Sequence, residues 1–149
     1  MQIEKRKITY SNKGNFDRFK ALGVKQPFAN DLISGAKSVE IRNHRTKYRG
    51  EVLICSYKFP KMAGYESGAT LGLAELYDIK RVGDFTDEDW EQTRVPREQR
   101  KNIKHGFGWF FKNPRSVVEF PINCKLGLFD LFYTKGLIIE YPKHVKYDI

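Results

Sequence analysis

Apolar positions early in the chain recur at the spacing of a helix. Phe28, Leu32 and Ile33 lie on one face of a helix that would begin at Pro27. Proline suits the first turn of a helix, where its missing N–H costs nothing, and a glycine after the last turn supplies a stop. We therefore predict a short helix over residues 27–34 whose three apolar side chains, Phe28 included, enter the core.

The next segment has the two-residue alternation of a strand. Val39 and Ile41 fall on one face, so Glu40 and Arg42 share the other face. Lys37 stands at the first residue of this segment, where its direction is not yet determined. A carboxylate between two cations suits a polar or anionic ligand. The same residues would also make an ordinary ion pair on an exposed strand face, so the spacing alone leaves both readings open.

Aromatic and β-branched residues dominate much of the remaining chain and favour strands. A loop is expected over residues 60–68, which contain two glycines and a proline. Residues 1–21 are polar with sparse apolar anchors, and we expect an extended arm or an edge strand there. Strands are expected over residues 51–58, 69–82 and 107–111, from a turn at Asn113-Pro114 to Phe120, and over 126–133 and 136–141.

Two more short helices are expected between these strands. Thr86 is a favourable N-cap, the three acidic residues after it suit the positive end of a helix, and Phe85 can pack on Trp90. Pro96 can open the next helix, which would run to Lys104. Five to seven strands with two or three short helices predict the α+β class, with the strands curled into a barrel.

Composition narrows the kind of protein. At 149 residues the chain fits one domain, and 40% hydrophobic residues indicate a globular fold. No apolar run approaches the roughly 18 residues of a membrane span, and the basic residues 1–7 are not followed by the apolar part of a secretory signal. Cys55 and Cys124 lie among apolar residues and are expected as buried thiols, which fits a reducing cytosol. We expect a cytoplasmic protein without membrane contact.

Charge is the strongest global indication of a partner. The chain has 27 Lys and Arg against 18 Asp and Glu, a formal net charge of +9. A domain this basic attracts polyanions, nucleic acid above all. The charge could also serve solubility alone, because the basic residues are spread along the chain and only folding can gather them.

Several kinds of site have no support in the sequence. His44, His105 and His144 are far apart and no CxxC or HxxxH spacing occurs, so no metal is expected. The phosphate-binding and dinucleotide-binding glycine motifs and the GxSxG nucleophile motif are absent, so no cofactor is expected either.

The order of the motifs resembles the ASCH domain family of the PUA-like group. The helix that begins KQPF is followed by GxKxxExR over residues 35–42, a TKYRG turn and the apolar strand VLIC, and later by GWFFKNPR and KLGLFDL. The resemblance covers about residues 22–131. It implies a single domain over residues 1–149, a PUA-like curled barrel with an N-terminal arm, a C-terminal extension and the first helix packed across one opening.

The resemblance also implies a ligand cleft between the first helix and the barrel, with the GxKxxExR residues at its mouth. Arg and Lys would hold phosphate, while Gln26 or Glu40 would read base edges. An aromatic ring, Trp109, Phe28 or Tyr57, would stack on a base. Trp109 lies in an aromatic strand and could belong either to the core or to the cleft wall. The candidate ligand-binding residues are Lys25, Gln26, Lys37, Glu40, Arg42, Arg45, Lys58, Trp109 and Arg115.

These features predict a nucleic-acid-binding domain, with RNA preferred over DNA, or a binder of a modified nucleotide. The alternative is a small hydrolase of RNA or of a modified nucleoside, with Lys37 and a nearby carboxylate, Glu40, as catalytic residues. The chain resembles acetylcytidine amidohydrolases at one remove, but Glu40 stands where they have a Thr, so the hydroxyl nucleophile is missing. A protein-interaction module is a third reading, and the sequence does not specify the oligomeric state.

Overall fold

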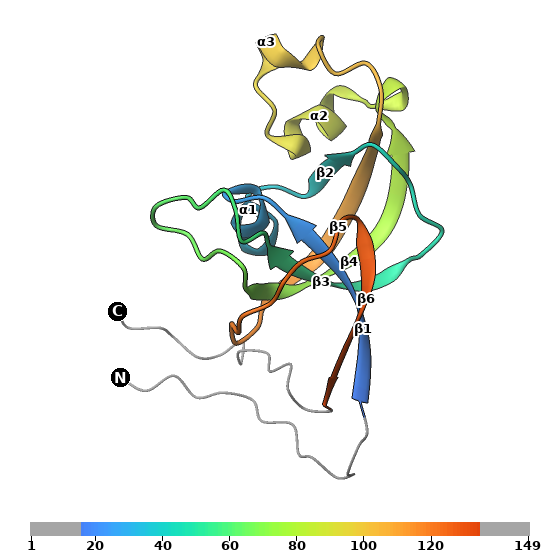
Figure 1. The fold of residues 1–149 in the computed structure, drawn as a ribbon. Helices are drawn as coiled ribbons and strands as arrows, with labels where there is room; N and C mark the ends of the chain where they lie inside the picture. The colour runs from blue at the N-terminus through green and yellow to red at the C-terminus, as the bar shows by residue number, and fades with distance from the viewer. Residues whose placement is uncertain (1–15, 135–149) are drawn as a thin grey trace.

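Six strands form one curved sheet in the computed structural model, which describes residues 16–134 (Figure 1). The strands are β1 Phe16–Val24, β2 Val39–Arg42, β3 Gly50–Ser56, β4 Thr70–Arg81, β5 Phe107–Ser116 and β6 Leu128–Thr134. Their order in the sheet is β2-β5-β4-β3-β1-β6. β1 and β3 are parallel, and every other neighbouring pair is antiparallel.

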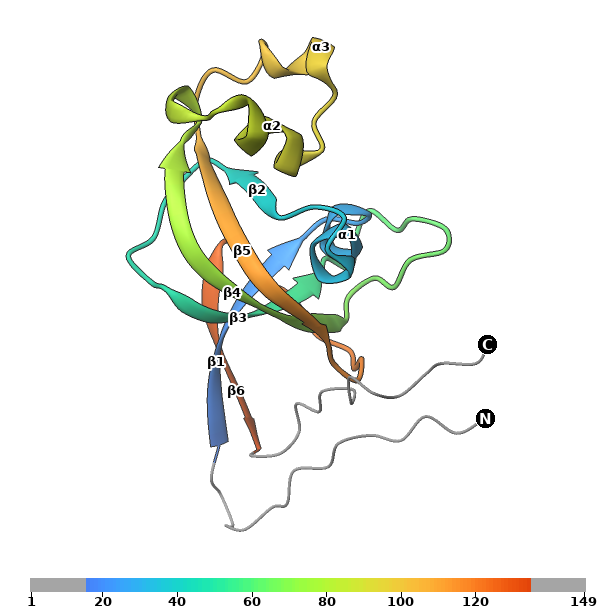
Figure 2. The same cartoon turned by 180° about the vertical axis from the view of Figure 1, so that it is seen from behind.

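The sheet is curved but open. β2 and β6 are its two edges, and they do not pair with each other. The α+β class is therefore correct, whereas the expected barrel is only approximated by the bend of the long strands β4 and β5 (Figure 2). Twisted strands bring the sheet part of the way around without closing it.

Three short helices complete the described part of the chain. They are α1 Phe28–Ser34, α2 Asp87–Thr93 and α3 Arg97–Arg100, with a 3-10 turn, η1 Val82–Asp84, before α2. α1 packs on one face of the sheet, and α2 and α3 lie beyond β2 at one end of the molecule (Figure 2). No helix within residues 16–134 is both long and apolar enough to cross a membrane.

Alternating residues of the inner strands supply two apolar clusters, one on each face of the sheet. In β3, Val52 and Ile54 pack with Leu32 of α1 on one face, while Leu53 and Cys55 pack on the other. A strand that is buried on both faces needs an uninterrupted apolar run, which explains the sequence VLIC. Cys55 and Cys124 are free thiols, and Cys124 is less deeply buried than Cys55.

Packing of α1 differs from the sequence prediction at one residue. Leu32 is 2% exposed and Ala29 is fully buried, but Phe28 is 47% exposed and lies outside the core. Phe28 is the first residue of the helix, directly after Pro27. Ala29 and Leu32, three residues apart on one face of the helix, therefore make the contact with the sheet, and the ring of Phe28 faces solvent.

Three other segments also differ from prediction. Residues 16–21 belong to β1, an inner strand between β3 and β6, and are not an added arm or edge. β5 runs through Asn113 without turning back, although Asn113 has a positive φ of 52° and the pairing with β4 shifts register nearby. α3 is only four residues long. The strand expected over 136–141 lies outside the described residues.

The predicted start of α2 is confirmed. The side chain of Thr86 accepts a hydrogen bond from the backbone N–H of Asp89, and the Asp89 carboxylate accepts one from the backbone N–H of Thr86. Phe85 packs edge-on against Trp90 with ring centroids 5.0 Å apart. These local contacts explain why the sequence alone locates this helix.

Candidate functional site

A cleft of about 790 Å³ opens between α1, β2 and the segments that follow β3 and precede β6. The start of α1 and β2 contribute charged and apolar side chains, Lys25, Phe28, Glu40, Ile41 and Arg42. The remaining lining comes from Asn43 and His44 after β2, Tyr57 and Phe59 after β3, and Leu126 and Gly127 before β6. The cleft thus lies beside the GxKxxExR strand.

β2 presents its polar side chains as the alternation predicts. Val39 is fully buried, while Glu40 and Arg42 share one face and form an ion pair with 3.8 Å between Glu40 Oε2 and Arg42 Nη1. Arg42 Nη1 also donates to the backbone carbonyl of Gly23, at 3.2 Å, and its buried Nε has no hydrogen-bond partner among residues 16–134. β2 pairs with β5, which holds this face at one edge of the sheet.

Lys37 is next to this pair but does not line the cleft. Its ammonium lies 3.1 Å from Glu40 Oε1, donates to the backbone carbonyl of Thr93 at 3.1 Å and lies 5.0 Å from the ring centre of Phe28. The side chain is 6% exposed. Lys37 therefore joins Glu40 to the end of α2 and positions the carboxylate.

Two of the predicted ligand-binding residues are buried and make hydrogen bonds within the protein. Trp109 has no exposed surface, so it cannot stack on a ligand; its Nε1 donates to the backbone carbonyl of His44 at 3.0 Å. Gln26 is buried, and its amide donates to the backbone of Glu66 and accepts from that of Asn30. Neither residue lines the cleft, and backbone groups already bind the polar atoms of both side chains.

Three predicted cations lie elsewhere on the surface. Arg115 pairs with Glu51 at the far end of β5. Lys58 lines a different hollow. Arg45 is exposed on the loop after β2, with its guanidinium 5.7 Å from the ring of Phe107. Of the nine predicted residues, Lys25, Glu40 and Arg42 line the cleft.

The aromatic side of the cleft comes from Phe28, Tyr57 and Phe59. Phe28 and Tyr57 were among the three rings predicted to stack on a base, whereas Phe59 was not predicted. Phe28, expected in the core, is an exposed wall, and Phe59 is 68% exposed. His44, Asn43 and Leu126 were not predicted either. An aromatic residue directly after a strand, followed by a loop, is the only sequence feature that could have indicated Phe59.

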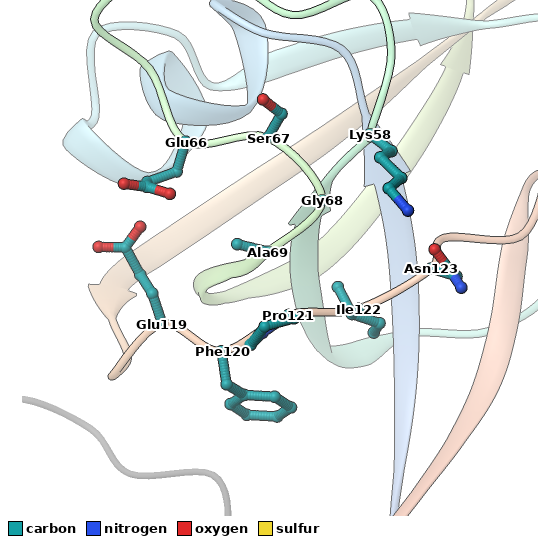
Figure 3. Close-up of a pocket in the computed structure, with 10 residues that line it drawn as sticks. All are labelled: Lys58, Glu66, Ser67, Gly68, Ala69, Glu119, Phe120, Pro121, Ile122 and Asn123. Atoms are coloured by element: carbon teal, nitrogen blue, oxygen red, sulfur yellow. The ribbon is translucent and has the colours of Figure 1, made fainter.

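A second hollow of about 500 Å³ lies between the 66–69 and 119–123 segments (Figure 3). The carboxylates of Glu66 and Glu119 point toward each other across it, while the ring of Phe120 points away. Burial, and then the charge of Glu66, raise the pKa of Glu119. Two acidic groups disfavour a polyanion, so this hollow is not the nucleic-acid candidate. Within residues 16–134 no group of three or more His, Cys, Asp or Glu side chains could hold a metal ion.

The fold and this cleft define a small α+β domain with an open mixed sheet and a charged, aromatic-lined site at one sheet edge. The sequence model of the ASCH domain matches residues 22–121. The chain belongs to the ASCH domain family.

Solved structures with the same fold come from Zymomonas mobilis ASCH proteins, without close sequence similarity. A serine-to-alanine mutant of ZmASCH aligns with a TM-score of 0.59 and 13% identity, covering 78% of this chain and 89% of that one. A tyrosine-to-phenylalanine mutant gives a TM-score of 0.55, 16% identity and coverage of 70% and 74%, respectively. The unmutated protein gives a TM-score of 0.54, 16% identity and coverage of 70% and 72%. A search of curated protein sequences found no match.

Proposed function

We propose that the protein is a nucleic-acid-binding domain that takes an unpaired base of RNA, or a modified nucleotide, into the cleft beside β2. One observation carries the proposal: exposed aromatic rings and a largely buried, ion-paired carboxylate line the same cleft of a basic protein. Membership of the ASCH domain family supports it.

The cleft residues can contact different parts of a nucleotide, according to the chemistry of each side chain. Phe28 and Phe59 offer exposed ring faces, on which any base can stack. Glu40 can accept hydrogen bonds from the N–H groups of a base edge. Lys25 and Arg42 can neutralise a phosphate at the same opening. A base can reach Glu40 only when it is unpaired, which favours single strands, loops and lone nucleotides over a duplex.

The hydrolase alternative gains no support from this geometry. Lys37 is buried, contacts two acceptors and does not line the cleft, so it does not face a substrate there.

Binding of fluorescent RNA and DNA oligonucleotides and of modified nucleosides tests the proposal. Phe28→Ala should weaken binding by about 1–3 kcal/mol, the usual value of one stacked base. The melting temperatures of parent and variant are measured beside binding, because the ring also lies against the Lys37 ammonium. The matched control is Tyr77→Ala, which removes a ring of similar exposure on β4, outside the cleft. Equal binding by the parent and Phe28→Ala, or no binding of any probe at low salt, would contradict the proposal.

A further inference from the structure

The cleft does not end at His44, Leu126 and Gly127. These three residues also line a neighbouring hollow of about 450 Å³, so they form a ridge between the two spaces. The other residues that line this neighbouring hollow are Lys20, Arg45, Thr46, Tyr48 and Leu128. The ridge is thus a shared wall, and a ligand that fills the cleft could continue across it.

Contacts with the buried Trp109 fix the position of His44 in this ridge. The His44 ring packs edge-on against the buried Trp109, 5.8 Å between centroids, and Trp109 Nε1 holds the His44 carbonyl. Gly127 has a positive φ of 69°, and a Cβ there would lie 3.2 Å from His44 Nε2. A glycine therefore allows the turn to approach the imidazole closely, and this turn carries Leu126.

Leu126 is 89% exposed, the most exposed of the large apolar side chains in the described part of the chain. No core packing accounts for an apolar side chain on top of a ridge between two hollows. Apolar side chains in such positions can insert between neighbouring bases and unstack them.

The neighbouring hollow has the chemistry of a second nucleotide site. Arg45 and Lys20 contribute two cations, and no acidic side chain of the described residues lines it. Lys20 lies 5.8 Å from the ring of Tyr48 and pairs with Asp130 at 2.8 Å. A ring beside cations suits a base and its phosphate.

We propose that the two hollows form one track for at least two successive nucleotides of a single strand, with Leu126 between the adjacent bases. The inference rests on the proposed function, because it extends the same site. It predicts that a dinucleotide binds more tightly than a lone nucleotide.

Affinities for the four nucleoside 5′-monophosphates and the four corresponding 5′-phosphorylated homodinucleotides test the track. At least one dinucleotide should bind about tenfold or more tightly than its monophosphate, the effect of one further stacked base. Arg45→Ala should reduce that ratio to below about threefold. The charge-matched control is Arg81→Ala, at the exposed end of β4 and outside both hollows; it should keep the parent ratio.

The fluorescence of a base analogue tests whether Leu126 lies between the two bases. In a dinucleotide with 2-aminopurine, insertion of a side chain between the bases should raise the fluorescence on binding, and Leu126→Ala should abolish most of that rise. Equal affinity for monophosphates and dinucleotides overturns the track but leaves the proposed function standing. Absence of any nucleotide or oligonucleotide binding overturns both.

Discussion

The Lys37 ammonium is enclosed by three groups from different parts of the chain: the Glu40 carboxylate, the Thr93 carbonyl and the Phe28 ring. At the scale of the residue, the Lys37 side chain connects the end of α2 to Glu40 in the cleft. Glu40 is consequently held from one side by Lys37 and from the other by Arg42. A carboxylate restrained in this way offers its oxygens to a ligand in a defined direction.

Removing the Lys37 ammonium should therefore destabilise the fold. Lys37→Met leaves the Thr93 carbonyl without this donor in a buried place, which costs about 1–3 kcal/mol of unfolding free energy. Urea unfolding followed by circular dichroism measures the loss. Lys25→Met, which changes an exposed cation of the cleft, should leave stability near that of the parent. A Lys37→Met protein as stable as the parent would show that these contacts contribute little.

Glu40 and Arg42 should differ in what they do for a ligand. Glu40→Gln keeps the shape of the side chain but replaces one acceptor oxygen by a donor, so it should change which nucleotide is preferred. Arg42→Ala removes a phosphate partner and should weaken all ligands alike. A panel of RNA, DNA and modified nucleosides, read beside melting temperatures, separates the two effects. If both variants bind like the parent but have much lower melting temperatures, Glu40 and Arg42 stabilise the fold and do not contact the ligand.

At the scale of the element, α1 depends on a few buried contacts because it is only seven residues long. Its side chains meet the sheet at Gly72 of β4, where an added Cβ would lie 2.7 Å from Ile33 Cδ1. The absence of a side chain at Gly72 lets the helix approach the strand closely. Leu32 fills the space beside this contact as part of the core.

Leu32→Ala should lower the free energy of unfolding by about 2–5 kcal/mol, the usual cost of truncating a buried leucine. Asn30→Ala, on the exposed side of the same helix, should change it by less than about 0.5 kcal/mol. Chemical unfolding of both variants measures the difference. Equal stability of the two would mean that α1 is not packed through Leu32.

α2 is tied to β4 by an ion pair with a pH dependence of known sign. Burial raises the pKa of Asp89, but the Lys80 ammonium, 2.8 Å away, and the Thr86 N–H outweigh it, so the pKa is lowered. A carboxyl group whose pKa is lower in the folded state binds more protons when unfolded. The ionised Asp89 therefore contributes fully to the free energy of unfolding above the ordinary carboxyl pKa of about 3.9. This contribution is lost as the pH falls through the lower pKa of the folded state.

Asp89→Asn should consequently be less stable than the parent at neutral pH, with a difference that shrinks as the pH falls below about 4. Asparagine can still accept the Thr86 hydrogen bond, so the comparison isolates the charge. Thermal unfolding at a series of pH values gives the difference. Asp87→Asn, in the exposed first turn of α2, is the control. A gap between parent and Asp89→Asn that is independent of pH would rule out the ion pair as its source.

At the scale of the whole molecule, the net charge of +9 predicts that binding of a polyanion weakens as salt rises. If nucleic acid is the ligand, log affinity should fall with log salt at about −0.7 for each phosphate contacted on a single strand. Lys47→Ala, which removes one exposed cation near the cleft loop, should weaken all sequences alike. Affinity that stays flat from low to moderate salt would leave the charge as a solubility feature.

Prediction from sequence succeeded where neighbouring residues determine the outcome. The capping box of α2 and the shared face of Glu40 and Arg42 both follow from spacings of two or three residues. Gln26 and Trp109 could not be placed in this way. The backbone carbonyls that accept hydrogen bonds from them lie 40 and 65 residues away along the chain, and only the folded sheet brings those carbonyls to them.

Pairing between β1 and β6 brings Phe16 opposite Thr134, so the described part of the chain begins and ends at one place (Figure 1). A folded unit whose entry and exit are side by side can be spliced into a surface loop of a host protein with little strain on either partner. The same adjacency permits circular permutation, with a short linker across this pair and new ends in the exposed 60–66 loop. The cleft, whose residues Leu126 and Gly127 lie at the opposite end of β6 from Thr134, could in this way be carried intact into a host protein.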